Sequence, residues 1–162
     1  MANNSGSSEW LCERALLSPH NASVNHLNWS LMEEFPGDSH QYLSADRADS
    51  EEDVVTYPME FLNSLDLPGM PAHILTLKVG SPVIVLRSIQ PPKVTNGTRC
   101  VIQKLGNNVI EAKIATGRHK DEVILLPRIP FVPTDLPFRF RRLQFPIKPC
   151  FAMTINKGVY IL

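Results

Sequence analysis

The chain has 162 residues, enough for one ordinary domain or for a small domain with part of another. Hydrophobic residues make up 43% of it, a fraction that allows a folded core. No apolar run approaches the roughly 20 residues that a membrane span needs, and the polar start lacks the apolar region of a signal peptide. We therefore expect a soluble, intracellular protein with no membrane partner.

Formal charges cancel over the whole chain but are distributed unevenly. Residues 1–66 include twelve acidic and two basic residues, a net charge of −10. Residues 67–162 include four acidic and fourteen basic residues, a net charge of +10. A basic half of this size on a β-rich module is typical of a protein that binds polyanions; a solvated charged surface is the alternative.

The N-terminal segment predicts a short strand and a capped helix, which together are half of a βαβ unit. Residues 14–19 predict a buried strand that ends at a loop. Asn21 is predicted to cap a helix over residues 21–35, because its side chain can accept a hydrogen bond from a free backbone N–H. Apolar residues at three- and four-residue steps form one face of this helix: Val24, Leu27, Leu31 and Phe35. Pro36-Gly37 is predicted to end the helix.

Three shorter features connect this helix to the middle of the chain. Residues 40–44 predict another strand. Residues 46–53 are rich in acidic side chains and predict a solvated, mobile loop. Residues 58–65 predict a short helix with Pro58 near its first turn, where the missing N–H costs nothing.

Residues 72–129 contain short apolar runs that recur about every ten residues, which suits a small antiparallel barrel or sandwich better than helices. The runs are residues 73–77, 83–86, 98–105, 109–115 and 122–126. Ile110, Ala112 and Ile114 alternate with polar residues, which predicts a strand with one face on a core. Asn96-Gly97 predicts a type I′ hairpin turn, because both residues tolerate positive φ; a loop glycine is the alternative.

The basic C-terminal part begins with four prolines between residues 127 and 137, which predict an extended surface segment. Phe138-Arg139-Phe140-Arg141-Arg142 then alternates aromatic and basic residues. Such a strand can stack bases and hold phosphates, or it can bury both phenylalanines and leave the arginines in water. The alternation favours the second interpretation. Residues 150–155 predict a buried strand.

The sequence has no recognisable catalytic or metal-binding pattern of its own. Cys12, Cys100 and Cys150 are far apart and include no CxxC pair, which disfavours a metal site or a disulfide framework. None of the five histidines follows the spacing of a hydrolase triad. No GxxxxGK[ST] loop is present, so no segment is predicted to hold the phosphates of ATP or magnesium.

Several blocks resemble Pif-type (petite integration frequency) DNA helicases, a group that includes the helicases of Helitron transposons. The blocks similar to the accessory-domain signature are Tyr57-Pro58-Met59-Glu60-Phe61-Leu62-Asn63-Ser64-Leu65, Leu77-Lys78-Val79-Gly80-Ser81-Pro82-Val83 and Asn96-Gly97-Thr98-Arg99. Ser18-Pro19-His20-Asn21 resembles the fourth motif region of that family. Gln144-Phe145-Pro146-Ile147 and then Phe151-Ala152-Met153-Thr154-Ile155-Asn156-Lys157 resemble the approach to its fifth motif. The blocks follow the order of the family.

The resemblance implies an α/β fold with an inserted small all-β barrel. In that picture an incomplete RecA-like domain of the P-loop NTPase type contains a Src-homology-like β-barrel as an insertion. The implied divisions are a disordered tail over residues 1–10, the first part of the second RecA-like domain over 11–57, the accessory barrel over 58–130, and a return to the truncated RecA-like domain over 131–162. Two complete RecA-like domains in the parent family use ATP and magnesium to drive 5′-to-3′ translocation on single-stranded DNA.

The same resemblance implies that six residues lie near the DNA backbone: Ser18, His20, Asn21, Thr154, Asn156 and Lys157. Lys78, Arg99 and Arg141 of the basic half are further predicted contacts to nucleic acid. Hydroxyl, amide and cationic groups bind phosphate oxygens without reading sequence, so we expect weak, non-specific binding of single-stranded DNA. For Thr154 and Asn156, hydrogen bonding at the end of a strand is the alternative.

The expected function is that of a noncatalytic, DNA-contacting fragment of a helicase. The chain is predicted to be inactive toward ATP alone, and a separate N-terminal ATPase half is the expected partner. The resemblance implies DNA repair, recombination, telomere maintenance or transposition in the parent protein, and a nuclear location. After Lys157 the family continues with Ser-Gln-Gly and a helix, whereas this chain has Gly158-Val159-Tyr160-Ile161-Leu162. The alternative is a stand-alone β-barrel module that binds protein or nucleic acid through its charged face. In that alternative the acidic residues 46–53 fold over this face and occupy it as a phosphate would.

Overall fold

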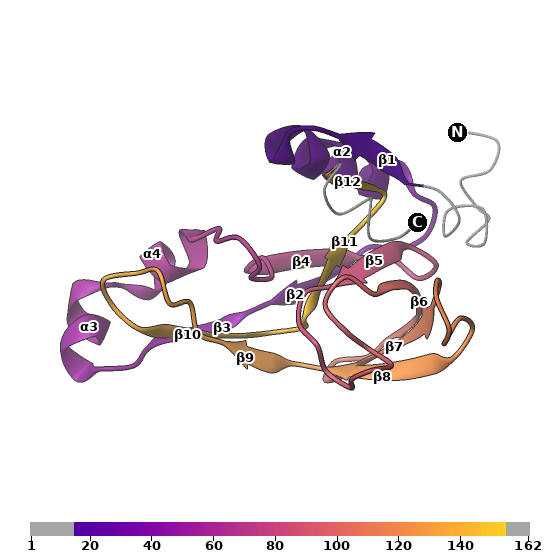
Figure 1. The fold of residues 1–162 in the computed structure, drawn as a ribbon. Helices are drawn as coiled ribbons and strands as arrows, with labels where there is room; N and C mark the ends of the chain where they lie inside the picture. The colour runs from indigo at the N-terminus through magenta and orange to yellow at the C-terminus, as the bar shows by residue number, and fades with distance from the viewer. Residues whose placement is uncertain (1–14, 155–162) are drawn as a thin grey trace.

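The computed structural model describes residues 15–154, which form fifteen numbered strands and helices shown in Figure 1. In chain order they are β1 (Leu16–Ser18), α2 (Asn21–Glu34), β2 (His40–Leu43), β3 (Ala45–Ala48), α3 (Glu51–Thr56), α4 (Met59–Ser64), β4 (Ile74–Leu77), β5 (Pro82–Val85), β6 (Arg99–Leu105), β7 (Val109–Ile114), β8 (Val123–Pro127), β9 (Ile129–Phe131), β10 (Phe140–Gln144), β11 (Ile147–Pro149) and β12 (Ala152–Thr154). None of the helices within residues 15–154 is long and apolar enough to cross a membrane.

An antiparallel sheet of five strands, in the order β11-β5-β6-β7-β8, forms the centre of the molecule. Each of the five apolar runs predicted between residues 72 and 129 overlaps one of the strands β4 to β8, which confirms the β-rich interpretation of this stretch. The β6–β7 ladder shifts register between Ile102 and Lys104, so β6 has a bulge there.

The main core lies between this sheet and a two-stranded ribbon of β2 and β4. Ile110, Ala112 and Ile114 on β7 are at most 1% exposed, as their alternation predicted. Tyr42 of β2 and Ile147 of β11 pack into the same cluster. The core therefore joins strands from both sides of the 58–130 segment.

The turn at Asn96-Gly97 differs from the predicted type I′ hairpin. Gly97 has a φ of +96°, whereas Asn96 is not among the residues with positive φ. The Thr98 N–H donates to the Thr95 carbonyl over 3.0 Å, which closes a four-residue turn. Positive φ at the third position alone is typical of a type II turn. The two strands flanking this loop are separated by thirteen residues, so the loop is too long for a two-residue hairpin.

A second sheet, in the order β3-β10-β9, corrects the prediction of a mobile loop over residues 46–53. Residues 45–48 form β3, which pairs with β10, and residues 51–56 form α3, whose first turn Ser50 caps by accepting from the Asp53 N–H. Asp46 is 5% exposed and forms a bidentate pair with Arg142. The acidic segment is therefore ordered by a basic partner from the other half of the chain.

Phe138 and Phe140 are buried against α4, as the core interpretation of the aromatic and basic segment predicted. The Phe138 ring stacks on Tyr57 with centroids 3.8 Å apart. Arg142 was predicted to lie in water and is instead fully buried, whereas Arg139 and Arg141 are exposed. The strand β10 thus has one outward basic face and one inward face that includes a guanidinium.

The third part is a parallel pair, β1 and β12, covered by α2 (Figure 1). The strand predicted over residues 14–19 is present as β1, although Leu17 is 55% exposed rather than buried. On α2, Val24 and Phe35 are buried, but Leu27 and Leu31 are only half-buried. Asn28 and Met32 complete the buried face. The helix ends at Glu34, with Phe35 as its C-cap, before Pro36-Gly37 as predicted.

Candidate nucleic-acid interface

The parallel pairing of β1 with β12 brings two distant segments of the chain together. Ser18 and Thr154 are direct Cα partners in this ladder. Parallel strands present their carboxyl ends at the same edge, where open α/β sheets bind their ligands. Ser18, His20 and Asn21 therefore lie beside the end of β12, where the sequence continues toward Asn156 and Lys157. These last two residues lie outside the described part of the chain.

The N-terminus of α2 begins at this edge. His20 is the N-cap residue, its side chain makes no capping hydrogen bond, and the first turn has no acidic residue. The predicted cap, Asn21, is instead the first helical residue and is exposed. The first N–H groups of a helix have no partner within it, and the helix dipole makes this end favourable for an anion. We call Ser18, His20, Asn21 and Thr154 the strand-end site.

Asn28 fixes the position of α2 over β12, and sequence reasoning did not single it out. Its side-chain Nδ2 donates to the Ala152 carbonyl over 3.0 Å, and its Oδ1 accepts from the Phe151 and Ala152 N–H groups over 2.8 and 2.7 Å. Asn28 is 7% exposed, so these bonds form in a dry environment. The sequence offered one signal for Asn28: it is a polar residue four positions after Val24, on the otherwise apolar face of the helix.

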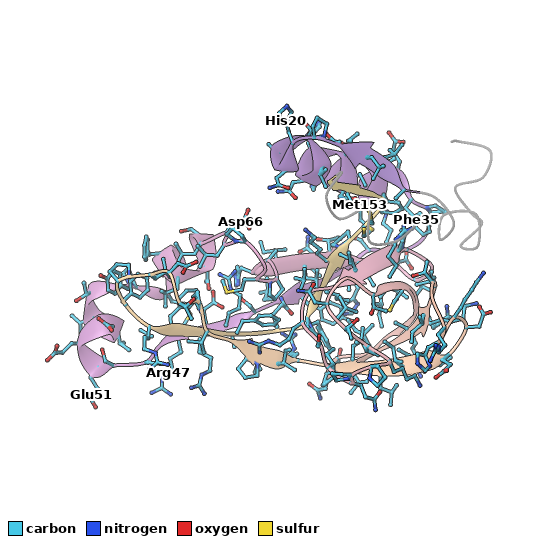
Figure 2. The ribbon with its side chains drawn as sticks, in the orientation of Figure 1. His20, Phe35, Arg47, Glu51, Asp66 and Met153 are labelled. Atoms are coloured by element: carbon cyan, nitrogen blue, oxygen red, sulfur yellow. The ribbon has the colours of Figure 1, made fainter. Side chains whose placement is uncertain are left out.

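Lys78, a predicted contact to nucleic acid, has its ammonium group inside the protein. Its Nζ donates to the carbonyls of Phe35 and Glu33 over 2.7 and 3.3 Å, at the C-terminus of α2. A cation at this end of a helix is favoured by the helix dipole. Figure 2 shows Phe35 at the end of α2 opposite to His20. Lys78 therefore links β4 to α2 and lies at the far end of the helix from the strand-end site.

Arg99 is also buried, with 2% exposure, and its Nη2 donates to the Cys150 carbonyl over 3.1 Å. This bond ties β6 to the segment just before β12. Arg141 is exposed on β10, directly opposite Arg47 of β3 in the ladder. Figure 2 shows Arg47 pointing away from the sheet. The structure therefore brings Ser18, His20, Asn21 and Thr154 together and places Lys78, Arg99 and Arg141 elsewhere.

Within residues 15–154, no group of three or more His, Cys, Asp or Glu side chains is placed to hold a metal ion. The strand-end site has hydroxyl, amide, imidazole and backbone N–H groups. These groups can bind the oxygens of a phosphate through hydrogen bonds. The arrangement is a polar edge on a small α/β unit, with the first backbone N–H groups of α2 beside it.

Comparison with known proteins shows that the fold is similar to part of solved DNA helicases. Residues 60–105 match the family model described as DNA helicase Pif1, 2B domain. No curated protein matches the sequence. The resemblance to Pif-type helicases is confirmed by this match together with the likeness of the fold to solved Pif1 structures.

Three solved structures illustrate the likeness. The unliganded Pif1 from Bacteroides sp. is 21% identical with a TM-score of 0.64, and the match covers 96% of this chain and 45% of that one. Bacteroides Pif1 bound to ssDNA is 20% identical with a TM-score of 0.63, covering 90% and 32%. The Pif1 helicase from Candida albicans is 18% identical with a TM-score of 0.63, covering 89% and 36%. The chain thus spans less than half the length of these helicases.

Proposed function

We propose that this chain is the noncatalytic, single-stranded-DNA-contacting part of an ATP-dependent DNA helicase of the Pif type. The observation that carries the proposal is the convergence of Ser18, Asn21 and Thr154 at the carboxyl ends of two parallel strands, beside a helix N-terminus without acidic residues. The similar Pif1 from Bacteroides has been solved bound to ssDNA, which supports the same kind of ligand here.

The chemistry of the strand-end site suits a nucleic-acid backbone. Hydroxyl, amide and backbone N–H groups donate to phosphate oxygens and do not read base edges. Binding that depends on phosphate contacts alone is weak and non-specific, with a Kd on the order of 10⁻⁴ to 10⁻⁶ M at physiological salt. We propose that β1, α2 and β12 belong to an incomplete second RecA-like domain, and that the strands β4 to β8 are its inserted Src-homology-like barrel.

ATP hydrolysis and 5′-to-3′ translocation belong, in this proposal, to the whole helicase. The sequence contains no GxxxxGK[ST] loop, so a separate N-terminal half would bind ATP and magnesium. The purified chain is expected to hydrolyse no ATP by itself. Roles in repair, recombination, telomere maintenance or transposition, including that of Helitrons, and a nuclear location are part of the proposal through the family.

The test is an Asn21→Asp substitution, with binding of a fluorescent oligothymidine of twenty nucleotides measured by anisotropy. A carboxylate in the first turn favours the helix by about 0.3–1 kcal/mol but repels a phosphate at the same place. We therefore expect weaker DNA binding by a chain whose stability is unchanged or higher. This combination separates loss of binding from loss of folding.

The matched control is Asn107→Asp, the same charge change in the exposed turn between β6 and β7. It should lower the affinity much less than Asn21→Asp, because it lies in a different turn and contacts no DNA. Equal affinities of the two variants, or an Asn21→Asp chain that binds as well as the original, would contradict a phosphate at the strand-end site.

A further inference from the structure

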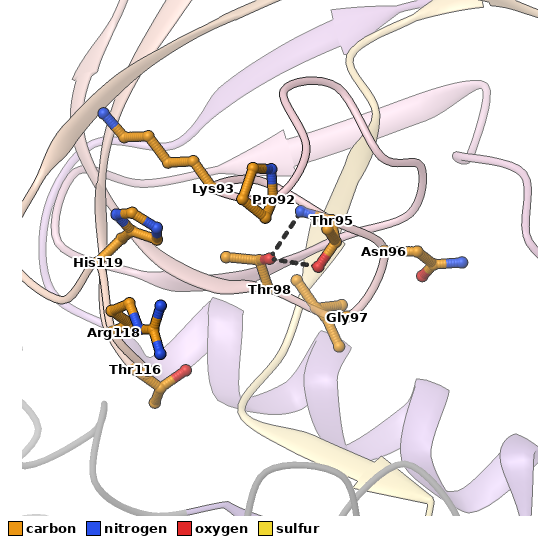
Figure 3. A pocket seen from close by; sticks show the side chains of 11 residues that line it. Pro92, Lys93, Thr95, Asn96, Gly97, Thr98, Thr116, Arg118 and His119 are labelled. Carbon is orange, nitrogen blue, oxygen red and sulfur yellow. Dashed lines mark hydrogen bonds between the residues drawn. The ribbon is translucent and has the colours of Figure 1, made fainter.

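A pocket of about 590 Å³ lies between two loops of the central sheet, and none of the predicted contacts explains it. One loop joins β5 to β6 and contributes Lys93, Asn96 and Thr98, and the other joins β7 to β8 and contributes Arg118 and His119. Figure 3 shows Arg118 and His119 along one side of the pocket, with Thr98 facing them. All ionisable side chains that line this space are basic.

Lys93 and His119 are held in place by one carboxylate. Glu122 forms an ion pair with the Lys93 ammonium and a hydrogen bond of 2.8 Å with Nδ1 of His119. The hydrogen bonds from Lys93 and then from His119 lower the pKa of Glu122, so the carboxylate stays charged and keeps both partners oriented. The Arg118 guanidinium makes no hydrogen bond or ion pair with any residue in the range 15–154. Among the three basic residues, Arg118 is thus the one whose donors are all unengaged by residues 15–154.

The opposite wall offers open backbone and hydroxyl groups. Gly97 and Gly117 both line the pocket with positive φ, and a Cβ added at either would meet no atom within 4 Å. The Thr98 hydroxyl lies 3.0 Å from the Thr95 N–H, whose hydrogen bond it accepts, and 3.5 Å from the Thr95 hydroxyl (Figure 3). The Thr98 hydroxyl proton can therefore turn toward a ligand oxygen. Guanidinium, imidazole, ammonium and hydroxyl donors around a space without acids match the oxygens of a phosphate group.

We propose that this pocket binds a phosphodiester group of the same single-stranded DNA that contacts the strand-end site. The inference rests on the proposed function. Ile84 of β5 is part of the wall of this pocket and also of the larger groove of about 830 Å³ that reaches Asn21. The two proposed anion-binding places therefore adjoin the same residue of β5, and single-stranded DNA is a ligand that offers phosphates to both.

The experiment uses the full chain labelled with ¹⁵N at its glycines. Gly97 and Gly117 report on the pocket, and Gly37, which lines neither the pocket nor the groove, is the reference. The chain is titrated with the twenty-nucleotide oligothymidine and, separately, with inorganic phosphate. We expect the oligonucleotide to shift the amide signals of Gly97 and Gly117 but not that of Gly37.

Arg118→Gln tests the residue that carries the site, and Lys120→Gln is its matched control. Lys120 is exposed in the same turn, has the same charge and does not line the pocket. Arg118→Gln should weaken oligonucleotide binding about tenfold, the effect of one lost charged hydrogen bond. It should also reduce the dependence of log K on log salt by about 0.7, the value for one phosphate of a single strand. Lys120→Gln should leave the shifts of both glycines in place.

The outcomes separate this inference from the proposed function. Oligonucleotide binding that leaves Gly97 and Gly117 unshifted would overturn the pocket while the strand-end site stands. Shifts with inorganic phosphate alone would overturn DNA as its ligand. If Arg118→Gln and Lys120→Gln bind the oligonucleotide with identical affinity and salt dependence, Arg118 does not contact the DNA. Absence of any oligonucleotide binding would contradict both proposals.

Discussion

The Arg142 guanidinium has an acceptor for each of its five N–H groups. Its Nε and Nη2 donate to the two carboxylate oxygens of Asp46 over 3.0 and 2.9 Å, and both side chains of the pair are completely buried. The remaining N–H groups donate to the carbonyls of Leu62, Leu65 and Pro71. One side chain therefore joins β10 to β3, to α4 and to the segment that follows α4.

We expect Arg142→Ala to destabilise the fold by about 3–5 kcal/mol, because it leaves the Asp46 carboxylate buried without its partner. Urea unfolding, followed by circular dichroism, measures the loss. The control is Arg141→Ala at the neighbouring exposed position, where a change within about 0.5 kcal/mol is expected. Similar losses for the two variants would show that the buried pair has no special role.

Ionisation of the Tyr42 phenol makes the free energy of unfolding depend on pH in the alkaline range. Burial raises the pKa of its phenol above the ordinary value of 10.0, and the nearby Arg128 guanidinium offsets part of this effect. Its hydroxyl donates to the Gly106 carbonyl over 2.8 Å, which also needs the neutral form. A group whose pKa is raised in the fold contributes stability that is complete below the pKa of the unfolded chain and is lost as the pH rises through the folded value.

The original chain should therefore lose stability relative to Tyr42→Phe as the pH rises from about 8 to about 10.5, across the ordinary tyrosine pKa. Urea unfolding of both chains at the two pH values measures the difference. A difference that stays constant with pH would mean that the Tyr42 phenol titrates alike in the folded and unfolded chains.

The alternation of Phe138 and Phe140 could be predicted, because period two is a local property of a strand. The same alternation places Arg142 on the inward face, whereas its positive charge predicts that the side chain is exposed to water. A guanidinium can be buried only with a partner, and Asp46 lies 96 residues earlier. The burial of Lys78 and Arg99 escaped prediction for the same reason, since their acceptors are carbonyls 43 to 51 residues away.

The helix α2 depends on side-chain contacts more than on its own capping. Its N-cap makes no side-chain hydrogen bond, and its last turn has no basic residue of its own. Asn28 binds it to β12, and Lys78 provides the positive charge at its C-terminus. The edge that forms the strand-end site is therefore positioned by Asn28 and Lys78, which are not themselves part of that site.

Asn28→Ala should separate α2 from β12, because the Phe151 and Ala152 N–H groups would lose their acceptor. We expect a loss of about 2–4 kcal/mol, since each buried unsatisfied group costs about 1–3 kcal/mol. Hydrogen exchange of these two amides should speed up more than that of the central sheet. Asn25→Ala, on the exposed side of the same helix, is the control. Unchanged exchange at Phe151 and Ala152 would contradict this account of how α2 is held.

The strands β4 to β8 could be predicted because their apolar runs and turn residues are close together in sequence. Each pairs with a neighbour along the chain, apart from β4, which pairs with β2. The strand β3 could not be predicted, because it is stabilised by β10, more than ninety residues later. A local count of acidic residues predicts that their carboxylates repel one another. In the fold, Arg142 of β10 provides the opposite charge for Asp46 of β3.

The charge asymmetry of the sequence does not become two separated halves of the molecule. The pairing of β3 with β10 shows that acidic and basic segments interleave. Asp46 pairs with Arg142, and the Asp49 carboxylate lies 3.9 Å from the Arg139 guanidinium. Part of the basic charge is therefore neutralised inside the fold. Arg141 on β10 and Arg118 in the pocket between the loops are among the cations that remain exposed to a polyanion.

The strand-end site could be anticipated only through the resemblance of its blocks to the helicase family. Spacing alone does not bring Ser18 to Thr154, because 136 residues separate them. The parallel ladder supplies the missing contact, and it turns two short polar motifs into one edge. The proposed function therefore requires DNA to lie along this edge.

The most direct measurement is photochemical cross-linking of an oligothymidine in which 5-iodouracil replaces single thymines, followed by tryptic mass mapping of the full chain. The strand-end site predicts cross-links in the tryptic peptides of residues 15–47 and 143–157, which contain Ser18 to Asn21 and Thr154 to Lys157. Additional cross-links in peptides 94–99 and 114–118 would agree with the pocket between the loops. Cross-links confined to other peptides, such as that of residues 48–78, would contradict the central claim.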